Sequence, residues 1–298
     1  MSVVTAPLPR RAANQPTPYH PRKGQVSINT LSDDALLEIF HRYREDQLYF
    51  ITWWWWTLVH VCRRWRRIVL ASPGHLHLLL PCNGNTPTKN TLPIWPPFPI
   101  SITCFPWHTK ANKGIENVIV ALKCHDRVSE ITLDGIDGPI LEKFATAMQE
   151  PFPALTYLRL SSPELTKVVL PDTFLGGSAP RMRSFALLGI PFPAFPQLVL
   201  SAKHLLSLRL WDIPDAGYIS PENMANCLAE LPYLEALSIC FLTFRSGLVQ
   251  KNPPPSARIL LRSLTYFAFR GHGAYLEDLR ARVDIPSVNE VEILYDIF

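Results

Sequence analysis

The apolar positions between residues 36 and 43 recur at the spacing of a helix. They are Leu36, Ile39, Phe40 and Tyr43, which an α-helix places on one side. Ser32 precedes them and can accept a hydrogen bond from the first backbone amides, while Asp33 and Asp34 suit the positive end of a helix. Leu31 and Leu36 flank this start as a hydrophobic staple. The pattern predicts a helix whose apolar side needs a partner.

A second apolar pattern, from about Thr52 to Leu70, predicts another helix. Its apolar side carries Trp53, Trp56, Leu58, Val61, Cys62, Trp65 and Ile68. Its other side carries Arg63, Arg64, Arg66 and Arg67. The run from Ser72 to Gly74, with Pro73 at its centre, is a strong helix stop. On this interpretation Trp53 and Trp56 have a core role, whereas Trp54 and Trp55 do not.

This stretch has two other possible interpretations, a membrane span and a basic recognition signal. The apolar run from Leu48 to Cys62 could be a membrane span, but it is short of the roughly 20 residues that cross a bilayer and polar residues interrupt it. The arginines from 63 to 67 could form a nuclear import signal or a nucleic-acid contact. Such clusters are more often the solvated side of an amphipathic helix. We therefore expect neither a membrane nor a nucleic acid as a partner.

A repeated pattern of apolar, x, x, apolar, x, apolar follows residue 125. The segments are Val128-Ile131-Leu133, Leu155-Leu158-Leu160, Met182-Phe185-Leu187, Leu205-Leu208-Leu210, Leu234-Leu237-Ile239, Leu264-Phe267-Phe269 and Val288-Val291-Ile293. The shortest interval runs from Met182 to Leu205, and the longest from Leu234 to Leu264. The pattern predicts one short strand in each repeat, stacked into a curved parallel sheet.

Helical patterns lie between several of these strands. Residues 139 to 149 carry apolar side chains at helical spacing. Ser220 is a cap followed by Pro221 at the first helical position, and residues 275 to 282 form a third candidate helix. Helices or proline-rich turns are therefore expected to return the chain between strands.

The residues that alternate with the buried leucines predict a binding surface on the concave side of the sheet. Six stand out because Arg, Tyr and Trp dominate binding hot spots: Tyr157, Arg159, Arg209, Trp211, Tyr266 and Arg270. Paired arginines bind oxyanions, so an acidic or phosphorylated segment would suit them. The alternative is that each is an ordinary exposed strand residue.

Composition sets the limits of these interpretations. The chain has 298 residues, 47% of them hydrophobic, so it can bury a large core. Charged residues make up 18%, and the 29 prolines favour many short elements joined by rigid turns. The net charge of +4 neither requires nor excludes nucleic acid.

Two proline-rich segments flank the helical patterns. Residues 1–27 contain no acidic residue and read as a disordered basic tail. A transit peptide is the alternative, but five prolines would break the helix that it needs. Residues 92 to 99 are apolar as well as proline-rich, which favours packed extended chain over a proline-motif ligand.

The sequence contains few residues in patterns typical of catalytic, redox or metal sites. The six cysteines form no C-x-x-C pair, and no apolar signal peptide opens the chain, so we expect free thiols in the cytoplasm or nucleus. His75 and His77, with Cys82 nearby, are an incomplete metal-ligand set, so no metal and no cofactor is expected. No nucleophile, phosphate-loop or dinucleotide motif is present, so we expect no enzyme.

The helical stretch resembles an F-box, the module by which substrate receptors dock on the adaptor of SCF-type ubiquitin ligases. The matching elements are Leu31 before an acidic turn, the run Leu36-Leu37-Glu38-Ile39-Phe40, and the run Val61-Cys62-Arg63-Arg64-Trp65-Arg66. Ser32 departs from the family, which usually has proline there. The resemblance implies an adaptor-binding set of Leu31, Ser32, Leu36, Leu37, Ile39, Phe40, Val61, Cys62 and Trp65.

The later repeats resemble leucine-rich repeats of irregular type, whose intervals are about 20 to 29 residues. The positions of the usual Asn ladder hold other residues, namely Ile136, Pro163, Ile190, Ile213, Leu242, His272 and Asp296. The turns must therefore satisfy their amides differently.

Together these patterns predict an α/β (α+β) chain in four parts. After the tail come an F-box helical module at 28–75, a proline-rich segment at 76–124 packed on the repeats, and a leucine-rich-repeat solenoid of about seven repeats at 125–298. The resemblance implies a non-catalytic substrate receptor that joins an unknown protein substrate to the adaptor and, through it, to a cullin. A non-ligase interaction scaffold and a basic nucleic-acid-associated protein are the alternatives.

Overall fold

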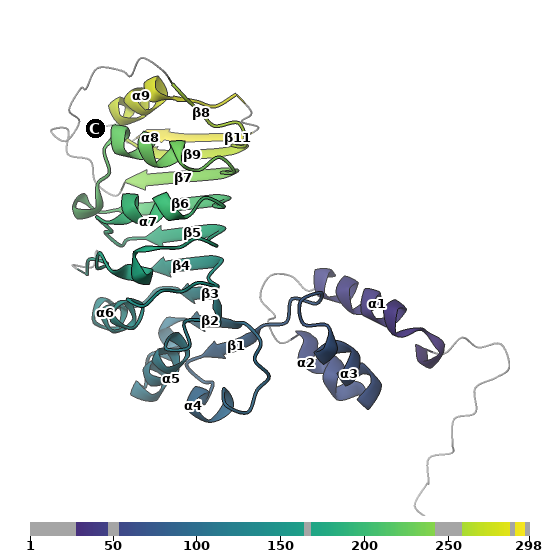
Figure 1. The fold of residues 1–298 in the computed structure, drawn as a ribbon. Helices are drawn as coiled ribbons and strands as arrows, with labels where there is room; N and C mark the ends of the chain where they lie inside the picture. The colour runs from purple at the N-terminus through teal and green to yellow at the C-terminus, as the bar shows by residue number, and fades with distance from the viewer. Residues whose placement is uncertain (1–27, 47–53, 164–167, 242–257, 287–289, 296–298) are drawn as a thin grey trace, which may run out of the picture.

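A computed structural model describes residues 28–46, 54–163, 168–241, 258–286 and 290–295. The chain is a mixed α/β protein with one large parallel sheet. Three amino-terminal helices lie beside the end of the sheet at which the chain enters it, and the rest of the chain climbs strand by strand (Figure 1). The expected tail at 1–27 lies outside the described residues. No helix among the described ranges is long and apolar enough to cross a membrane.

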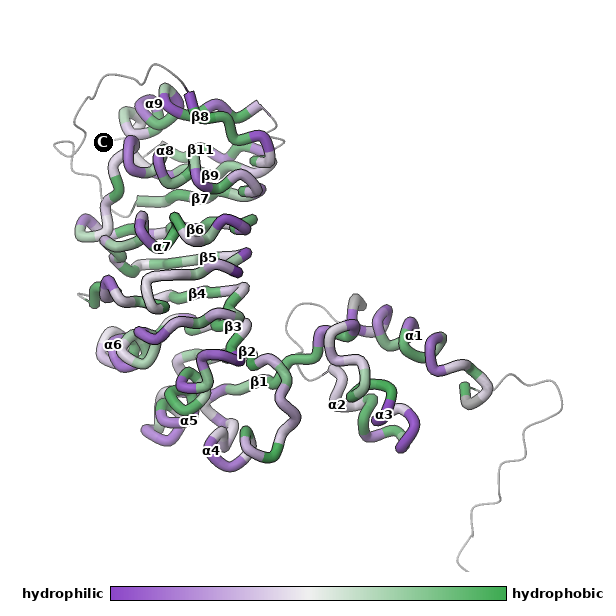
Figure 2. The backbone as a smooth tube through the Cα atoms, in the orientation of Figure 1, coloured by the Kyte–Doolittle hydropathy of each residue, from purple (hydrophilic) through white to green (hydrophobic). Residues whose placement is uncertain are grey.

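The described part of the helical module, residues 28–46 and 54–75, contains one 3-10 turn and three helices. They are η1 (Ile28–Thr30), α1 (Asp33–Asp46), α2 (Trp54–Val61) and α3 (Arg63–Ala71). The predicted cap is confirmed, because the Ala35 amide donates to Ser32 Oγ at 3.1 Å. Hydrophilic and hydrophobic residues alternate along α1 in Figure 2, as expected for a helix with one buried side.

The prediction of one continuous helix from about Thr52 to Leu70 is wrong. The chain breaks at Cys62, whose backbone is extended at φ −158° and ψ 171°. The Cys62 thiol accepts a hydrogen bond from the Trp65 amide at 3.5 Å and so caps α3. Because the break resets the helical phase, apolar residues before and after Cys62 do not share one side.

The roles assigned to the tryptophans are also corrected. Trp54 and Trp55 are buried, whereas Trp56 is exposed; Trp53 lies outside the described residues. Trp55 Nε1 donates to the Leu79 carbonyl at 3.0 Å, and its ring meets the Phe98 ring edge-on at 6.1 Å. The buried side of α2 therefore joins the module to the proline-rich segment.

Among the described residues, nine parallel strands form the main sheet, in the order of the chain. They are β1 (Leu80–Asn83), β2 (Ile100–Cys104), β3 (Val128–Leu133), β4 (Tyr157–Ser161), β5 (Ser184–Leu188), β6 (Ser207–Ile213), β7 (Ala236–Phe241), β9 (Tyr266–Gly271) and β11 (Glu290–Tyr295). Two short strands, β8 (Ile259–Leu260) and β10 (Val283–Asp284), pair separately.

The predicted register of the repeats is confirmed. Leu158 pairs with Phe185, which pairs with Leu208, and the row continues through the second apolar position of each repeat to Val291. These residues are buried except Val291, which lies on the edge strand β11 of the described sheet.

The sheet begins before the boundary expected at residue 125. Residues 76–124 supply β1, β2, α4 (Thr88–Thr91), η2 (Pro106–His108) and α5 (Asn112–Leu122). Ile102 of β2 pairs with Ile131 of β3, so this segment continues the same apolar row. Packing of the proline-rich run is confirmed by the buried Phe98 and by Arg127, which donates to the Phe98 carbonyl at 3.0 Å.

Further helices return the chain between the later strands. They are α6 (Gly138–Ala147), η3 (Phe174–Gly177), α7 (Phe195–Ser201), η4 (Asp215–Gly217), α8 (Pro221–Ala229) and α9 (Gly273–Arg282). All three predicted helices are confirmed, and Ser220 Oγ caps α8 by accepting from the Asn223 amide at 3.2 Å.

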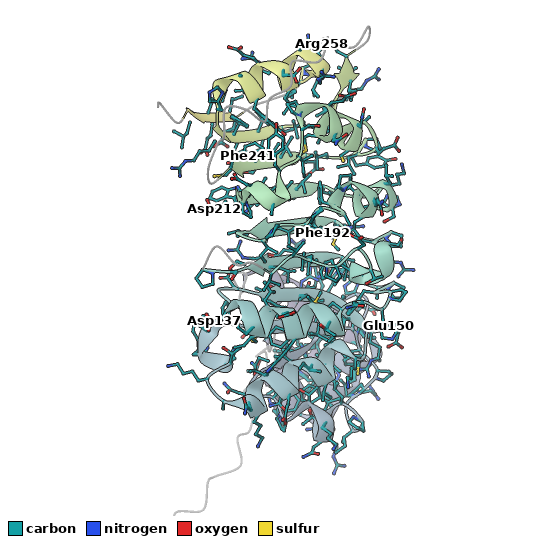
Figure 3. All side chains as sticks on the ribbon, turned by 90° about the vertical axis from the view of Figure 1, so that its left-hand side faces the viewer. Asp137, Glu150, Phe192, Asp212, Phe241 and Arg258 are labelled. Carbon is teal, nitrogen blue, oxygen red and sulfur yellow. The ribbon has the colours of Figure 1, made fainter. Side chains whose placement is uncertain are left out.

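The positions of the usual Asn ladder hold other residues, and the turn amides instead donate to backbone carbonyls of the neighbouring strand. The Ile136 amide donates to the Ser161 carbonyl at 2.9 Å, and the Gly189 amide donates to the Trp211 carbonyl at 2.9 Å. The ladder positions Ile136, Ile190 and Ile213 are instead buried in the core. In Figure 3, Asp137, Asp212 and Phe241 lie one above another near the edge where these turns stack.

Candidate functional site

The adaptor-binding residues expected from the resemblance divide into buried and exposed groups. Leu36 and Phe40 are almost fully buried, and the Phe40 ring lies 4.8 Å from that of Trp65. They form the core between α1 and α3, so they have a structural role within the module, and their expected contact with the adaptor stays a prediction. Leu31, Leu37 and Trp65 are partly buried against the same core.

Four large apolar residues on α1 and α2 are exposed, and we call this set the module surface. They are Ile39 (44% exposed), Tyr43 (38%), Trp56 (40%) and Val61 (57%). Ile39 and Tyr43 are one helical turn apart on α1, so they share a side. Tyr43 and Trp56 were not in the predicted set. Tyr43 lies on the apolar side of α1 that the sequence pattern predicts, so helical spacing could have identified it, whereas no sequence signal separated the exposed Trp56 from its buried neighbours. Ser32 and Cys62, which were in the set, are also exposed.

Ion pairs fasten the start of α1 to α3. Asp33 accepts from Arg64 at 2.7 Å and from Arg67 at 3.2 Å, and Arg64 also donates to the Leu31 carbonyl at 2.5 Å. Hydrogen bonding to Arg64 is the main cause that lowers the pKa of Asp33. Arg66 donates to the Val59 carbonyl at 2.9 Å. Much of the arginine cluster thus has a structural role, while Arg63 stays exposed.

The second candidate surface is the strand face, the side of the sheet that carries the six predicted hot-spot residues. Arg159, Ala186 and Arg209 are paired in register on β4, β5 and β6. Because neighbouring strands lie about 4.8 Å apart, the two arginines begin about 10 Å from each other across a small residue.

Arg159 and Arg209 differ in their partners. Arg159 forms an ion pair with Asp134 at 3.2 Å, and Asp134 also accepts from Ser161 Oγ at 2.7 Å. Arg209 is exposed and has no carboxylate partner among the described residues. Arg209 is therefore the better placed of the two to bind an anion.

The two tyrosines of the predicted set are half-buried at the amino-terminal ends of their strands. Tyr157 pairs with Ser184, and Tyr266 pairs with Ala236. The Tyr266 hydroxyl donates to Glu292 at 3.2 Å. Desolvation raises the pKa of Tyr266, Glu292 adds to the rise, and Arg209 opposes it. Tyr266 and Arg209 therefore lie within electrostatic reach of each other.

A cavity of about 340 Å³, the strand-face cavity, opens beside Trp211 and Arg270. Small residues of the middle strands, Ser238 and Ala268, contribute to its lining, while Trp211 and Leu294 are bulky residues at its sides. Trp211 Nε1 donates to Ser238 Oγ at 2.5 Å, which fixes the indole ring. The structure thus brings together two of the six predicted residues in one hollow.

The strand-face cavity contains residues that the sequence pattern missed. Asp212 has a positive φ of 50° and lies in an irregular stretch of β6 between Leu210 and Ile213. Cys240 Sγ donates to its carboxylate at 3.6 Å. Asp tolerates this backbone conformation better than most residues. The irregular stretch interrupts the inward and outward alternation along β6, and the prediction of strand-face residues relied on that alternation. Glu292 and Leu294 continue the alternation on β11, so the sequence pattern could have identified them as strand-face residues.

The buried thiols are not reactive groups. Burial raises the pKa of Cys82 and Cys104 to about 12 and that of Cys227 to about 11. Across the described ranges, no group of three His, Cys, Asp or Glu side chains could hold a metal ion.

A scan against protein-family models finds no matching family, and a search of curated proteins finds no match to this chain. Proposals about function therefore rest on the residues and on the geometry described above.

Proposed function

We propose that this protein is the substrate-recognition subunit of an SCF-type ubiquitin ligase. In this proposal the helical module is an F-box that docks on the ligase adaptor, and the parallel sheet with its helices is a leucine-rich-repeat solenoid that binds a target protein. The observation that carries the proposal is the module surface, because its four apolar side chains stay exposed on α1 and α2 although other apolar residues of these helices are packed in the core.

The proposed receptor performs no bond chemistry. It raises the effective concentration of target lysines near a ubiquitin-conjugating enzyme that is bound elsewhere in the assembly. Such a function fits the cytoplasm or the nucleus, where ubiquitin transfer takes place.

The strand face suggests the chemistry of the target. The strand-face cavity offers the Trp211 ring and the apolar Leu294, and it has Arg270 in its lining, with Arg209 on the same face. An apolar side chain next to an acidic or phosphorylated residue would match both features. We propose that a segment of this kind is the target motif.

Co-purification of the adaptor and cullin with the intact chain tests the docking half of the proposal. Ile39→Asp with Val61→Asp should abolish recovery of both, because charges would replace apolar contacts. Leu200→Asp is a matched control, since Leu200 is also an exposed apolar residue (52%) but lies on α7. Leu36→Asp is unsuitable, because Leu36 is buried and its loss would unfold the module.

The result separates the receptor from its alternatives. Recovery of the adaptor without a cullin would favour a non-ligase scaffold. Equal recovery with the wild type and the double variant would reject the module surface as the docking site.

A further inference from the structure

A second cavity, of about 400 Å³, lies where the helical module meets the sheet, and we call it the junction cavity. Its lining comes from three places: the segment that follows α3, the proline-rich run at 97–99, and the amino-terminal ends of β3 and β4. Its size falls within the range of about 300 to 1,000 Å³ that is typical of binding pockets. None of the interactions described above for the module surface or the strand-face cavity uses it.

The junction cavity contains one acid in a mainly apolar lining. Glu130 lines it together with Leu78, Phe98 and three prolines. The only hydrogen-bond partner that the described residues give its side chain is Ser101, whose hydroxyl donates at 3.0 Å. No described Lys or Arg forms an ion pair with Glu130, so the carboxylate is left without a cation. Desolvation raises the pKa of Glu130, and the bond from Ser101 opposes the rise.

The other polar groups of the junction cavity have acceptor capacity left but few hydrogens to donate. The Ser129 hydroxyl already donates to the Ile100 carbonyl at 3.3 Å, and the Thr156 hydroxyl donates to the Ser129 carbonyl at 3.0 Å. Proline has no amide hydrogen. His77 is the exception; burial is the main cause that lowers its pKa, so it adds no positive charge at neutral pH. A ligand rich in donors and without acceptors would fit this lining.

We propose that the junction cavity binds the basic side chain of a lysine or arginine in a partner polypeptide, with Glu130 as its counter-ion. An ammonium group has three donors and no acceptor, and a guanidinium group has five donors. The alkyl stem of either side chain would lie against the apolar lining.

A polypeptide is the expected source because of where Glu130 lies. It pairs in register with Tyr157, so the junction cavity opens onto the strand face. This step rests on the proposed function, in which that face binds a target segment. A target bound to both places would carry a basic residue near the helical module and an acidic motif near Arg209.

Ligand-observed NMR titration of the intact chain tests the proposal without the ligase adaptor. The probes are a capped Ala-Lys-Ala peptide, the same peptide with norleucine in place of lysine, and butylamine. We expect the lysine peptide to bind and the norleucine peptide to bind at least about tenfold more weakly. Glu130→Gln should weaken the lysine peptide to the same extent, whereas Glu142→Gln, an exposed acid on α6, should not.

A second variant keeps the test valid if Glu130→Gln fails to fold. Gly74 lines the junction cavity, and a Cβ added there meets no atom within 4 Å. The substitution Gly74→Leu therefore meets no steric barrier, and its bulky side chain in the lining should hinder the lysine peptide while leaving the carboxylate in place. Equal binding of lysine and norleucine peptides, or unchanged binding by both variants, would overturn the proposal. Binding of butylamine without binding of the peptide would reject a polypeptide as the source.

Discussion

Trp55 and Trp56 are adjacent in sequence, yet one is buried and the other is exposed. The sequence pattern gave the wrong assignment because it treated residues 52 to 70 as one helix. The actual helix α2 starts at Trp54 and ends before Cys62, so its buried side is Trp54, Trp55, Leu58 and Val59. A break that depends on a thiol cap leaves almost no signal in hydrophobic periodicity.

Substitution of the two tryptophans should destabilise the protein to different extents. Trp55→Ala should lower the free energy of unfolding by about 3 to 5 kcal/mol, because it leaves a cavity and removes the hydrogen bond to Leu79. Trp56→Ala should lower it by about 1 kcal/mol or less. Urea unfolding followed by circular dichroism measures both. Equal losses would contradict the assigned positions.

Cysteine exposure gives a second prediction at this scale. Cys62 is the exposed thiol, whereas Cys82, Cys104 and Cys227 are buried with raised pKa values. A thiol reagent at neutral pH should modify Cys62 within minutes and the three buried thiols only after unfolding. Peptide mapping by mass spectrometry identifies the sites. Early labelling of Cys104 would show that β2 is not packed as described.

At the scale of elements, the contact between α1 and α3 depends on Asp33. Its pKa is held below the usual value of 3.8, so its contribution to stability is complete above that value. As the pH falls below 3.8, Asp33 takes up a proton in the unfolded chain before it does so in the folded chain, which favours unfolding. The contribution of Asp33 to stability is therefore lost as the pH falls through its lower pKa in the folded state.

Asp33→Asn should therefore lower the melting temperature at neutral pH and have progressively less effect below about pH 4. Thermal unfolding across this pH range measures the difference. Asp34→Asn is the control, since Asp34 lies in the same first turn of α1 but has no ion pair among the described residues. A constant difference at every pH would exclude the ion pairs as its cause.

The strands were the most predictable elements, for a physical reason. A strand buried on one side repeats every two residues, and stacked repeats need the same spacing in each tier, so β3 to β7, β9 and β11 could be aligned from sequence alone. The strands β1 and β2 carry alternating apolar residues as well, but Pro81, Pro97 and Pro99 obscured them. Proline is tolerated at these positions, because Pro81 lies in β1, the first strand of the sheet, and Pro97 and Pro99 lie just before β2.

The candidate sites were less predictable than the strands. Alternation identified Arg209 and Trp211 as outward residues, but it could not show that Arg159 is paired with Asp134. It also could not place the junction cavity, whose lining comes from segments far apart in sequence. Ion pairs and cavities depend on where turns bring such segments together.

The strand face predicts a difference between its two arginines in target binding. Arg209→Ala should weaken binding of an acidic or phosphorylated target segment by about tenfold or more, because Arg209 has no described carboxylate partner. Arg159→Ala should weaken it less, since its charge is already balanced by Asp134. Fluorescence anisotropy with a labelled target segment measures both constants. A larger loss for Arg159→Ala would contradict this ranking.

At the scale of the whole molecule, the two proposed binding places, the module surface and the strand-face cavity, lie at opposite ends of the described chain. The helical module exposes apolar side chains near the first strands, whereas the strand-face cavity lies at the last strands. The stacked sheet between them fixes their separation (Figure 1). In the proposed function, the target and the ligase adaptor would therefore bind at different places on the chain.

Calorimetric titration of the purified ligase adaptor into the intact chain tests this account most directly. We predict one-to-one binding by the wild type and by Leu200→Asp, and at least about a 30-fold loss for Ile39→Asp with Val61→Asp, as expected when hot-spot contacts are removed. Absence of binding by the wild-type chain, or equal binding by the double variant, would contradict the account.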